Sequence, residues 1–351
     1  MTFSTVPKNS KSEINKAGKI LSISKKNSQD YSRSLEIAEQ WRACHAYPLN
    51  TFNTNLRVNI RKVKGATIVA QRLKRMPTII DKLSRFPTMK LAQMQDIGGV
   101  RAIVNSIEEV KQLAKIYQNT KNTHFAHQLV NEKNYIESPR NEDGYRSLHF
   151  IYKYKNRRAE SYNGLLIELQ IRTKLQHMWA TAVETMDTLT GQALKYRKGQ
   201  KEWQDFFAVT SSAFAHIENS TLIPRFKHLN KEQTFEAVAK AEEQVKALDQ
   251  MKGLSIAADK ITKSKANTGY YHLIILNSLK KTVSIISFSK DKFQDAERTY
   301  SHYEERALIE KVEPVLVAAG TLKDLQKAYP NFFLDVKDFT KKIEEIIIGR
   351  R

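Results

Sequence analysis

The ten residues DIGGVRAIVN, at positions 96–105, predict a buried strand with charged residues at its edge and within it. The run GVRAIVN is apolar and rich in β-branched residues, as expected of a strand inside a core. Asp96 lies just before this strand, at a rim position suited to Mg²⁺, which prefers carboxylate oxygens. Arg101 lies within the strand, where an unpaired charge would be costly. Its partner is therefore either a bound phosphate or Asp96 itself.

Apolar periodicity and turn signals on either side of this strand predict a chain of alternating helices and strands. Asn163 and Gly164 form a common hairpin signal between two apolar segments. Pro48 interrupts the first long helical pattern and predicts its division into two helices. Further strands are expected at 67–69, 135–139, 148–154, 165–171, 270–277, 282–288 and 315–319, and helices at 34–64, 77–84, 106–118, 174–218, 231–251, 291–311, 322–329 and 336–348.

Composition divides the chain into four parts. Residues 1–60 predict a flexible and then helical N-terminal segment, and residues 61–250 contain the main domain with its trailing helices. The Lys-, Ser-, Ala- and Gly-rich stretch 251–269 predicts a linker. Residues 270–351 predict a small C-terminal α/β domain.

The formal net charge of +21 is unevenly distributed. Ten Lys and Arg residues but one acidic residue lie between Arg57 and Lys90. This surplus predicts a polyanionic ligand, with a generally basic solvated surface as the alternative. Cys44 is the single cysteine, which excludes a disulfide within the chain and a cysteine zinc site. The apolar runs are far shorter than the ~20 residues of a membrane helix, and no signal peptide is evident, so we expect a cytoplasmic protein without zinc or membrane contact.

One group of polar residues is expected to converge on the phosphates of a nucleotide. Arg72 and Lys74 alternate on an extended segment and would point the same way. Pro77 is expected to open a helix, on which Thr78 and Lys82 are four residues apart and share a face. The alternative is an ordinary solvated basic face.

Two further groups of residues are suited to binding a second substrate, the one that would accept a group from the nucleotide. Tyr145, in a Gly-Tyr turn that enters a strand, presents a ring for stacking on a base, which contributes ~1–3 kcal/mol. His149 follows and is suited to a phosphate or a ribose. Glu168, Gln170 and Arg172 alternate on the next strand, where the carboxylate can bind a metal ion or act as the base for an attacking hydroxyl. A single Tyr or His is, however, more often a core or surface residue.

In this order, these groups resemble the RelA/SpoT-type alarmone synthetase domain over residues 63–198. The resemblance implies an α+β fold with a mixed β-sheet core flanked by helices, Mg²⁺ as the cofactor, and transfer of pyrophosphate from ATP to a ribose 3′-hydroxyl with release of AMP. The segment HMWA at 177–180, followed by Glu184, also fits, although Thr185 stands where the family usually has histidine. The implied roles are ATP binding for Arg72, Lys74, Thr78, Lys82 and Arg101, metal binding and catalysis for Asp96 and Glu168, and acceptor binding for Tyr145, His149, Gln170 and Arg172.

The C-terminal part resembles that of the CapRel-type fused toxin–antitoxin branch of this family. The resemblance implies a pseudo-zinc-finger-like domain that restrains the enzyme, the 3′ CCA end of tRNA as the acceptor, inhibition of translation in anti-phage defence, and a phage structural (capsid) protein as the activator. Tyr300 and Tyr303 share one face of the helix at 291–311. We hypothesise that they plug the adenine side of the ATP site; the alternative is that they are packing aromatics.

Two other functions are compatible with these residues. Synthesis of (p)ppGpp from GTP or GDP would use the same chemistry with a different acceptor. An RNA-binding module without catalysis is the second, and the presence of Asp96 and Glu168 argues against it. The candidates for RNA contact are Lys153, Lys155, Arg157 and Arg158. The alternative is that these residues form a fully solvated loop.

Overall fold

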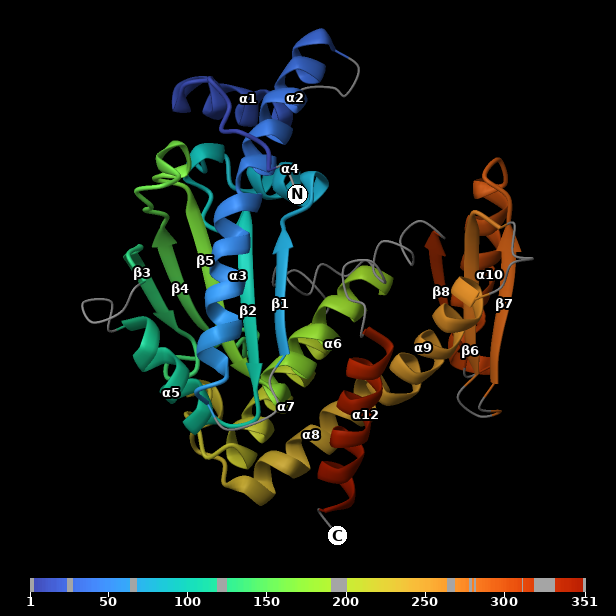
Figure 1. The fold of residues 1–351 in the computed structure, drawn as a ribbon. Coiled ribbons are helices and arrows are strands. Elements are labelled where there is room, and N and C mark those ends of the chain that lie inside the picture. Colours follow the sequence, from blue (N-terminus) through green and yellow to red (C-terminus); the bar gives the residue numbers. More distant parts are fainter. Residues whose placement is uncertain are drawn as a thin grey trace. The chain divides into compact units, whose positions relative to one another are not determined.

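The computed structural model describes residues 3–23, 28–63, 68–118, 125–190, 201–263, 269–277, 280, 282–310, 312–318 and 332–349 (Figure 1). The chain forms two compact units. The first comprises Met1–Ile136 and Ser147–Lys174, and the second comprises Glu137–Arg146 and Leu175–Arg351. The short segment 137–146 therefore belongs to the second unit, although the chain on both sides of it belongs to the first.

A five-stranded mixed sheet forms the centre of the first unit, with the strand order β1-β2-β5-β4-β3 (Figure 1). β2 and β5 are parallel, and the other neighbouring strands are antiparallel. The strands are β1 Ile68–Leu73, β2 Gly98–Val104, β3 Gln128–Asn134, β4 Leu148–Lys153 and β5 Leu166–Thr173. This arrangement confirms the predicted α+β class with a mixed sheet.

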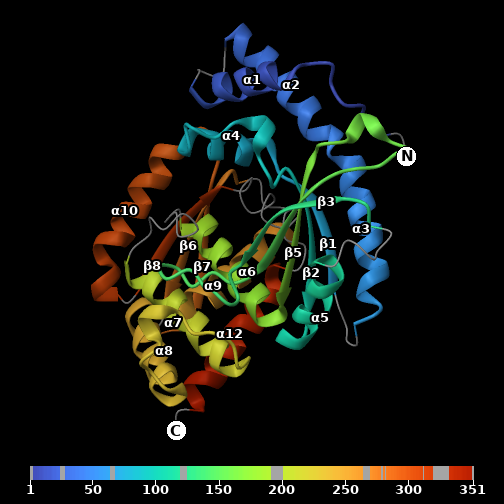
Figure 2. The same ribbon diagram turned by 90° about the vertical axis from the view of Figure 1, so that its left-hand side faces the viewer.

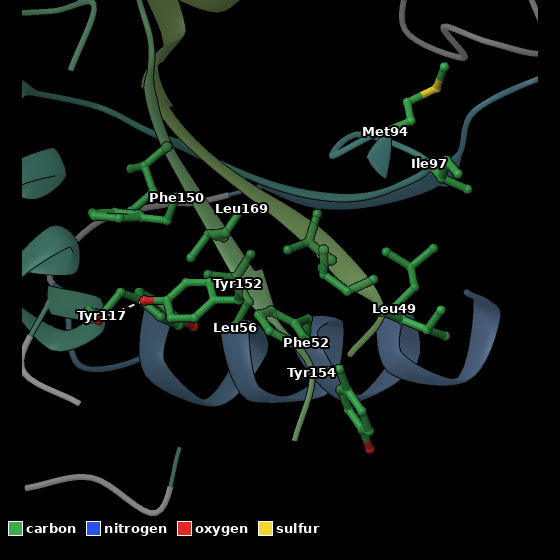
Figure 3. Close-up of a cluster of buried hydrophobic side chains, with 14 of the residues drawn as sticks. Leu49, Phe52, Leu56, Met94, Ile97, Tyr117, Phe150, Tyr152, Tyr154 and Leu169 are labelled. Carbon is green, nitrogen blue, oxygen red and sulfur yellow. Dashed lines mark hydrogen bonds between the residues drawn. The ribbon is translucent and has the colours of Figure 1, made fainter. Parts of the chain in front are cut away.

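Helices α3 and α5 pack on the apolar face of this sheet. Phe52 and Leu56 are four residues apart on α3 and are fully buried with Phe150 and Leu169 of the sheet (Figure 3). Burial of side chains of this size stabilises the fold by ~1.5–3 kcal/mol each. The opposite face of the sheet is left for polar side chains. The helices of this unit are α1 Lys11–Ile23, α2 Gln29–Cys44, α3 Ala46–Ile60, α4 Met76–Arg85 and α5 Ile107–Gln118.

The first helical segment divides as predicted, but at a different residue. α2 ends at Cys44 and α3 begins at Ala46, so the break lies at His45 and not at Pro48. Pro48 lies in the first turn of α3. Backbone N–H groups there have no partner within the helix, so a proline removes no hydrogen bond.

The strand predicted at 135–139 is wrong. Residues 128–134 form β3, and the chain turns directly after them. The side-chain oxygen of Asn134 accepts a hydrogen bond from the backbone N–H of Ile136 at 3.1 Å. This local turn ends the strand, since an Asn side chain can replace the backbone partner that a strand would need.

The second unit combines a helical bundle with a three-stranded antiparallel sheet of order β7-β6-β8. α12 packs on α8 and α9, and α10 packs on the small sheet (Figures 1 and 2). Trp179, Phe207, Phe214 and Phe339 are buried in one core of this unit. Its elements are α6 Lys174–Thr190, α7 Lys201–Ile217, α8 Lys231–Val245, α9 Ala247–Lys263, β6 Tyr271–Asn277, β7 Thr282–Phe288, α10 Phe293–Glu310, β8 Val312–Ala318 and α12 Phe332–Ile348.

The linker predicted at 251–269 is wrong over about its first two thirds, because α9 continues through Lys263. Lys and Ala, which suggested a linker, are also good helix formers. Met251 and Ala257 are buried in the core of the second unit and hold this helix in place. The predicted boundaries at 60, 250 and 270 also differ from the observed division of the chain into units. Residues 264–268 and the helix predicted at 322–329 lie outside the described residues.

In the described part of the chain, no helix has both the length and the apolar character needed to cross a bilayer. The expected pseudo-zinc-finger character of the C-terminal residues stays a prediction.

Candidate active site

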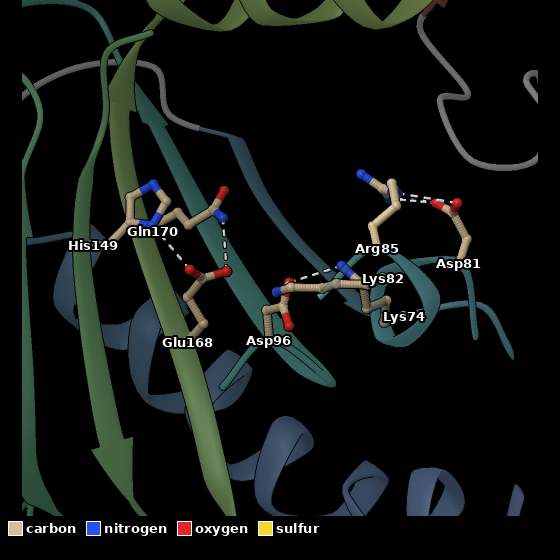
Figure 4. A network of polar contacts seen from close by, with 8 residues as sticks. All are labelled: Lys74, Asp81, Lys82, Arg85, Asp96, His149, Glu168 and Gln170. Carbon is tan, nitrogen blue, oxygen red and sulfur yellow. Dashed lines mark hydrogen bonds and ion pairs between the residues drawn. The ribbon is translucent and has the colours of Figure 1, made fainter. Parts of the chain in front are cut away.

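The parallel pairing of β2 with β5 brings the two predicted carboxylates together. Gly98 pairs with Ile167 and Gly99 with Glu168, and Asp96 lies two residues before the start of β2. Figure 4 shows the side chains of Asp96 and Glu168 near each other at this edge of the sheet. Asp96 is also close enough for its charge to act on the pKa of Glu168.

Two lysines hold the carboxylate of Asp96 (Figure 4). Lys74 Nζ and Lys82 Nζ lie 2.7 and 2.9 Å from the same oxygen, Oδ2. Burial acts to raise the pKa of Asp96, but the two ammonium groups outweigh it and lower the pKa to about 2. Asp96 is therefore ionised at any physiological pH.

A chain of hydrogen bonds links side chains of β4, β5 and β2 next to Asp96 and its two lysines. The ring of His149 lies with Nδ1 2.9 Å from Glu168 Oε1, and Gln170 donates to Glu168 Oε2 at 2.8 Å. Arg101 Nε donates to Gln170 Oε1 at 3.0 Å. The register places these residues side by side, because Gln170 lies opposite His149 on β4 and opposite Arg101 on β2. Among the described residues, the hydrogen-bond partner of Arg101 is thus Gln170, and the ion pair considered between Arg101 and Asp96 is not formed.

The surroundings of Glu168 favour the ionised form of its carboxyl group. Burial acts to raise its pKa, but the hydrogen bond and charge of His149, together with the hydrogen bond from Gln170, lower the pKa below its ordinary value. A carboxylate of low basicity is better suited to orienting a hydroxyl and binding a cation than to removing a proton completely.

Residues 71–188 match the family model described as the region found in RelA / SpoT proteins. This part of the chain, about a third of it, is therefore similar to the RelA/SpoT region. GTP pyrophosphokinase YjbM of Bacillus subtilis (strain 168) is 29% identical over 124 residues, which are 34% of this chain and 55% of that protein. GTP pyrophosphokinase YwaC of the same organism is 30% identical over 115 residues, 31% of this chain and 52% of the relative. The chain thus spans about half the length of the curated relatives that it matches.

Among solved structures, the small alarmone synthetase 1 of Bacillus subtilis, bound to its product pppGpp, has a TM-score of 0.41 and 22% sequence identity. That match covers 52% of this chain and 94% of the synthetase.

Two other predicted residues, Arg72 and Arg172, lie on the same side of the sheet as Glu168. Arg72 on β1 is opposite Gly99, whose other neighbour is Glu168. Thr78 is half-buried, one turn before Lys82 on α4. Arg172 shares the side of Glu168 by strand alternation but is buried.

The aromatic residues of the prediction belong to the second unit. The guanidinium carbon of Arg140 lies 4.5 Å from the centre of the Tyr145 ring, and the ring of Trp179 lies edge-on at 6.4 Å. Tyr300 and Tyr303 are half-buried against the apolar residues of the small sheet. This contact gives both tyrosines a packing role, and their role as a plug stays a prediction.

The donor set fits a magnesium ion that is bound together with phosphates. Among the described residues, Asp96 Oδ1 is buried without a hydrogen-bond partner, and the anionic Glu168 lies nearby. No group of three or more His, Cys, Asp and Glu residues suited to a metal occurs in the described part of the chain. Mg²⁺ sites in enzymes that bind phosphates commonly use one or two carboxylates and complete the shell with substrate and water.

Arg42 is a residue of this site that the sequence did not indicate. Its Nε donates to the backbone oxygen of Lys74 at 2.6 Å, while the backbone N–H of Lys74 donates to Ile97 at 2.8 Å. Arg42 lies on α2, 32 residues before its partner, inside an ordinary amphipathic pattern. No spacing signal connects it to the lysine, so its contact appears only in the fold.

Proposed function

We propose that this protein is a pyrophosphokinase that transfers the β,γ-pyrophosphate of ATP to a ribose 3′-hydroxyl. The observation that carries the proposal is the meeting of Asp96 and Glu168 with Lys74 and Lys82 at the edge of β2 and β5. The match of residues 71–188 to the RelA/SpoT region supports it, as do the two relatives named GTP pyrophosphokinases.

In the proposed reaction, the hydroxyl oxygen bonds to the β-phosphorus and the bond from that phosphorus to the oxygen of the α-phosphate breaks, so AMP leaves. Lys74 and Lys82 exchange their contact with Asp96 for the phosphates of ATP, and Arg72 and Arg101 add positive charge on the same side of the sheet. Glu168 accepts the hydrogen bond of the attacking hydroxyl, whose proton passes to solvent. Mg²⁺, held by Asp96 and Glu168 when bound, would neutralise phosphate charge. Catalysis of this kind depends mainly on positioning and electrostatic stabilisation.

For the acceptor, two candidates have separate support. A guanine nucleotide is favoured by the names of the two relatives. The 3′ CCA end of tRNA is favoured by the net charge of +21 and by the exposed side chains of Lys153, at the end of β4, and of Lys155, Arg157 and Arg158 in the loop that follows. Exposed cations of this kind neutralise RNA phosphates, and binding through them weakens with added salt.

The decisive experiment incubates the protein with Mg²⁺ and ATP labelled at the γ-phosphate, with GDP, GTP or bulk tRNA present in separate reactions. We expect label in one acceptor and an equal amount of AMP. Glu168→Gln and Asp96→Asn serve as controls and should transfer little. A folded wild-type protein that labels none of the acceptors and releases no AMP would exclude the proposal. Label in tRNA but not in GDP or GTP would select the RNA acceptor.

In this proposal the C-terminal residues also restrain the enzyme, and a phage structural protein releases that restraint, so that the protein becomes toxic to the cell. Replacing Tyr300 and Tyr303 together by alanine should raise toxicity in cells if the plug is correct. Both rings pack on the small sheet, so the stability of the variant has to be measured beside its toxicity. A stably folded double variant that remains harmless argues against the plug.

A further inference from the structure

The segment that carries Tyr145 is anchored to helix α7. Ser211, on α7, contacts both chain neighbours of Tyr145: its Oγ donates to the backbone oxygen of Gly144 at 2.6 Å and accepts from Arg146 Nε at 2.9 Å. One hydroxyl therefore fixes the backbone before the tyrosine and the side chain after it.

The backbone at Gly144 is shaped for this contact. Its φ is +79°, a conformation that other residues adopt only at a cost. A Cβ at this position would lie 2.8 Å from Ser211 Cβ and 3.1 Å from Ala208 Cα. Helix α7 and the turn at Gly144 thus approach each other as closely as their atoms allow.

The partner on the other side is an arginine whose burial is costly. Arg146 is 2% exposed, and burial lowers its pKa to about 10. In the described residues, its two terminal nitrogens are buried without a hydrogen-bond partner. The bond to Ser211 is therefore the direct hydrogen bond that offsets this cost, with the charge of Glu218 acting in the same direction. A buried and incompletely paired guanidinium is weak evidence for a stabilising role, which leaves positioning of its neighbours as the role to test.

Further contacts hold the backbone and the ring of Tyr145. The backbone N–H of Tyr145 donates to Asp143 Oδ1 at 3.0 Å, and Asp143 also pairs with Arg140 at 2.7 Å. The guanidinium of Arg140 in turn lies over the ring at 4.5 Å. Cation–π contact of this kind orients an aromatic side chain, so the ring direction follows from the backbone that Ser211 holds.

We propose that Ser211 is a positioning residue for the acceptor, acting through Gly144 and Arg146 on Tyr145. This inference rests on the proposed function, in which Tyr145 stacks on the acceptor base. A hydroxyl on α7, 66 residues after the tyrosine, would then set the affinity for the acceptor without touching it. The affinity for ATP, whose proposed ligands lie on other elements, would not depend on it.

The experiment compares Ser211→Ala with Ser212→Ala, both in the full chain. Ser212 is a matched control because its hydroxyl is equally buried in α7 but has no hydrogen-bond partner among the described residues. We expect Ser211→Ala to raise the KM for the acceptor about tenfold, the change that corresponds to losing about one net hydrogen bond. The KM for ATP should stay within twofold, and Ser212→Ala should match the wild type in both constants.

A second measurement does not depend on turnover. With 3-fluorotyrosine incorporated throughout, the ¹⁹F resonance of Tyr145 is assigned from the Tyr145→Phe variant. Ser211→Ala should shift or broaden this resonance, and Ser212→Ala should leave it unchanged. An unchanged resonance in Ser211→Ala, or equal acceptor KM values in the two alanine variants, would overturn the positioning role. If the wild type transfers no pyrophosphate, the proposed function fails, while the ¹⁹F comparison still decides whether Ser211 positions Tyr145.

Discussion

The ion pair at Asp96 makes a quantitative prediction about stability and pH. The pKa of this carboxyl is about 2 in the folded protein, compared with an ordinary value of 3.8. A depressed pKa stabilises the folded state above the ordinary value, and this stabilisation is lost as the pH falls towards the folded value. One pKa unit corresponds to about 1.4 kcal/mol, so Asp96 contributes about 2 kcal/mol near neutral pH. The side chain is 22% exposed, so solvent screening is limited.

Replacing Asp96 by Asn removes this titration and leaves two ammonium groups facing each other. The free energy of unfolding, measured by urea denaturation in EDTA, should fall by about 2 kcal/mol at pH 6. At pH 3 the wild type has lost about half of the contribution, so the gap between the two proteins should shrink by about 1 kcal/mol.

The exposed pair of Asp81 and Arg85 provides the control for this experiment. Asp81 is half-exposed, and surface pairs contribute ~0–1 kcal/mol, so Asp81→Asn should have the smaller effect at pH 6. Equal stabilities of Asp96→Asn and the wild type at pH 6 would refute the reasoning. A gap of the same size at pH 3 and pH 6 would also refute it.

Three other substitutions test separate parts of the structure. Glu168→Gln should lower pyrophosphate transfer by ~10²–10⁴-fold, the range for loss of a general base or an equivalent orienting group; AMP release measures this, and a rate near that of the wild type would remove Glu168 from the site. Phe339→Ala should cost ~3–5 kcal/mol in urea unfolding, because the ring is fully buried in the aromatic core of the second unit, and a cost below about 1 kcal/mol would contradict that packing. Tyr152→Phe should cost about 1 kcal/mol, since its hydroxyl donates to the backbone oxygen of Tyr117 at 2.6 Å; an unchanged unfolding midpoint would show that this bond is not formed in solution.

Apolar patterning predicted the central elements well. The strands β2, β4 and β5 and the helix α4 lie within a residue or two of their predicted bounds, because each has a strong pattern ended by a turn or a proline. β3 was missed because its sequence, QLVNEKN, is largely polar, as expected of an exposed strand at the edge of the sheet. α9 was missed because composition alone does not distinguish a Lys- and Ala-rich linker from a helix held by a few buried residues.

The site was predictable as a set of residues but not as a set of contacts. Asp96, Glu168, Lys74 and Lys82 were each expected, yet nothing in their spacing indicates that both lysines share one oxygen of Asp96. The pairing of His149 with Glu168 depends on the register between β4 and β5, which local sequence does not encode. Ser211 had no signal, since a serine inside an apolar helix is an ordinary residue.

The direction of one strand determines whether the predicted residues form a site. β2 has seven residues, so its ends are about 20 Å apart. With β5 parallel to β2, Glu168 near the start of β5 lies beside the start of β2, where Asp96 is. An antiparallel β5 in the same place would put Glu168 near the far end of β2, and no cation could contact both carboxylates. The connection between β2 and β5 contains α5, β3 and β4. It brings the chain back to the end of the sheet at which β2 begins, so that β5 can start there. The chemistry proposed for this protein therefore depends on that connection as much as on the acidic residues themselves.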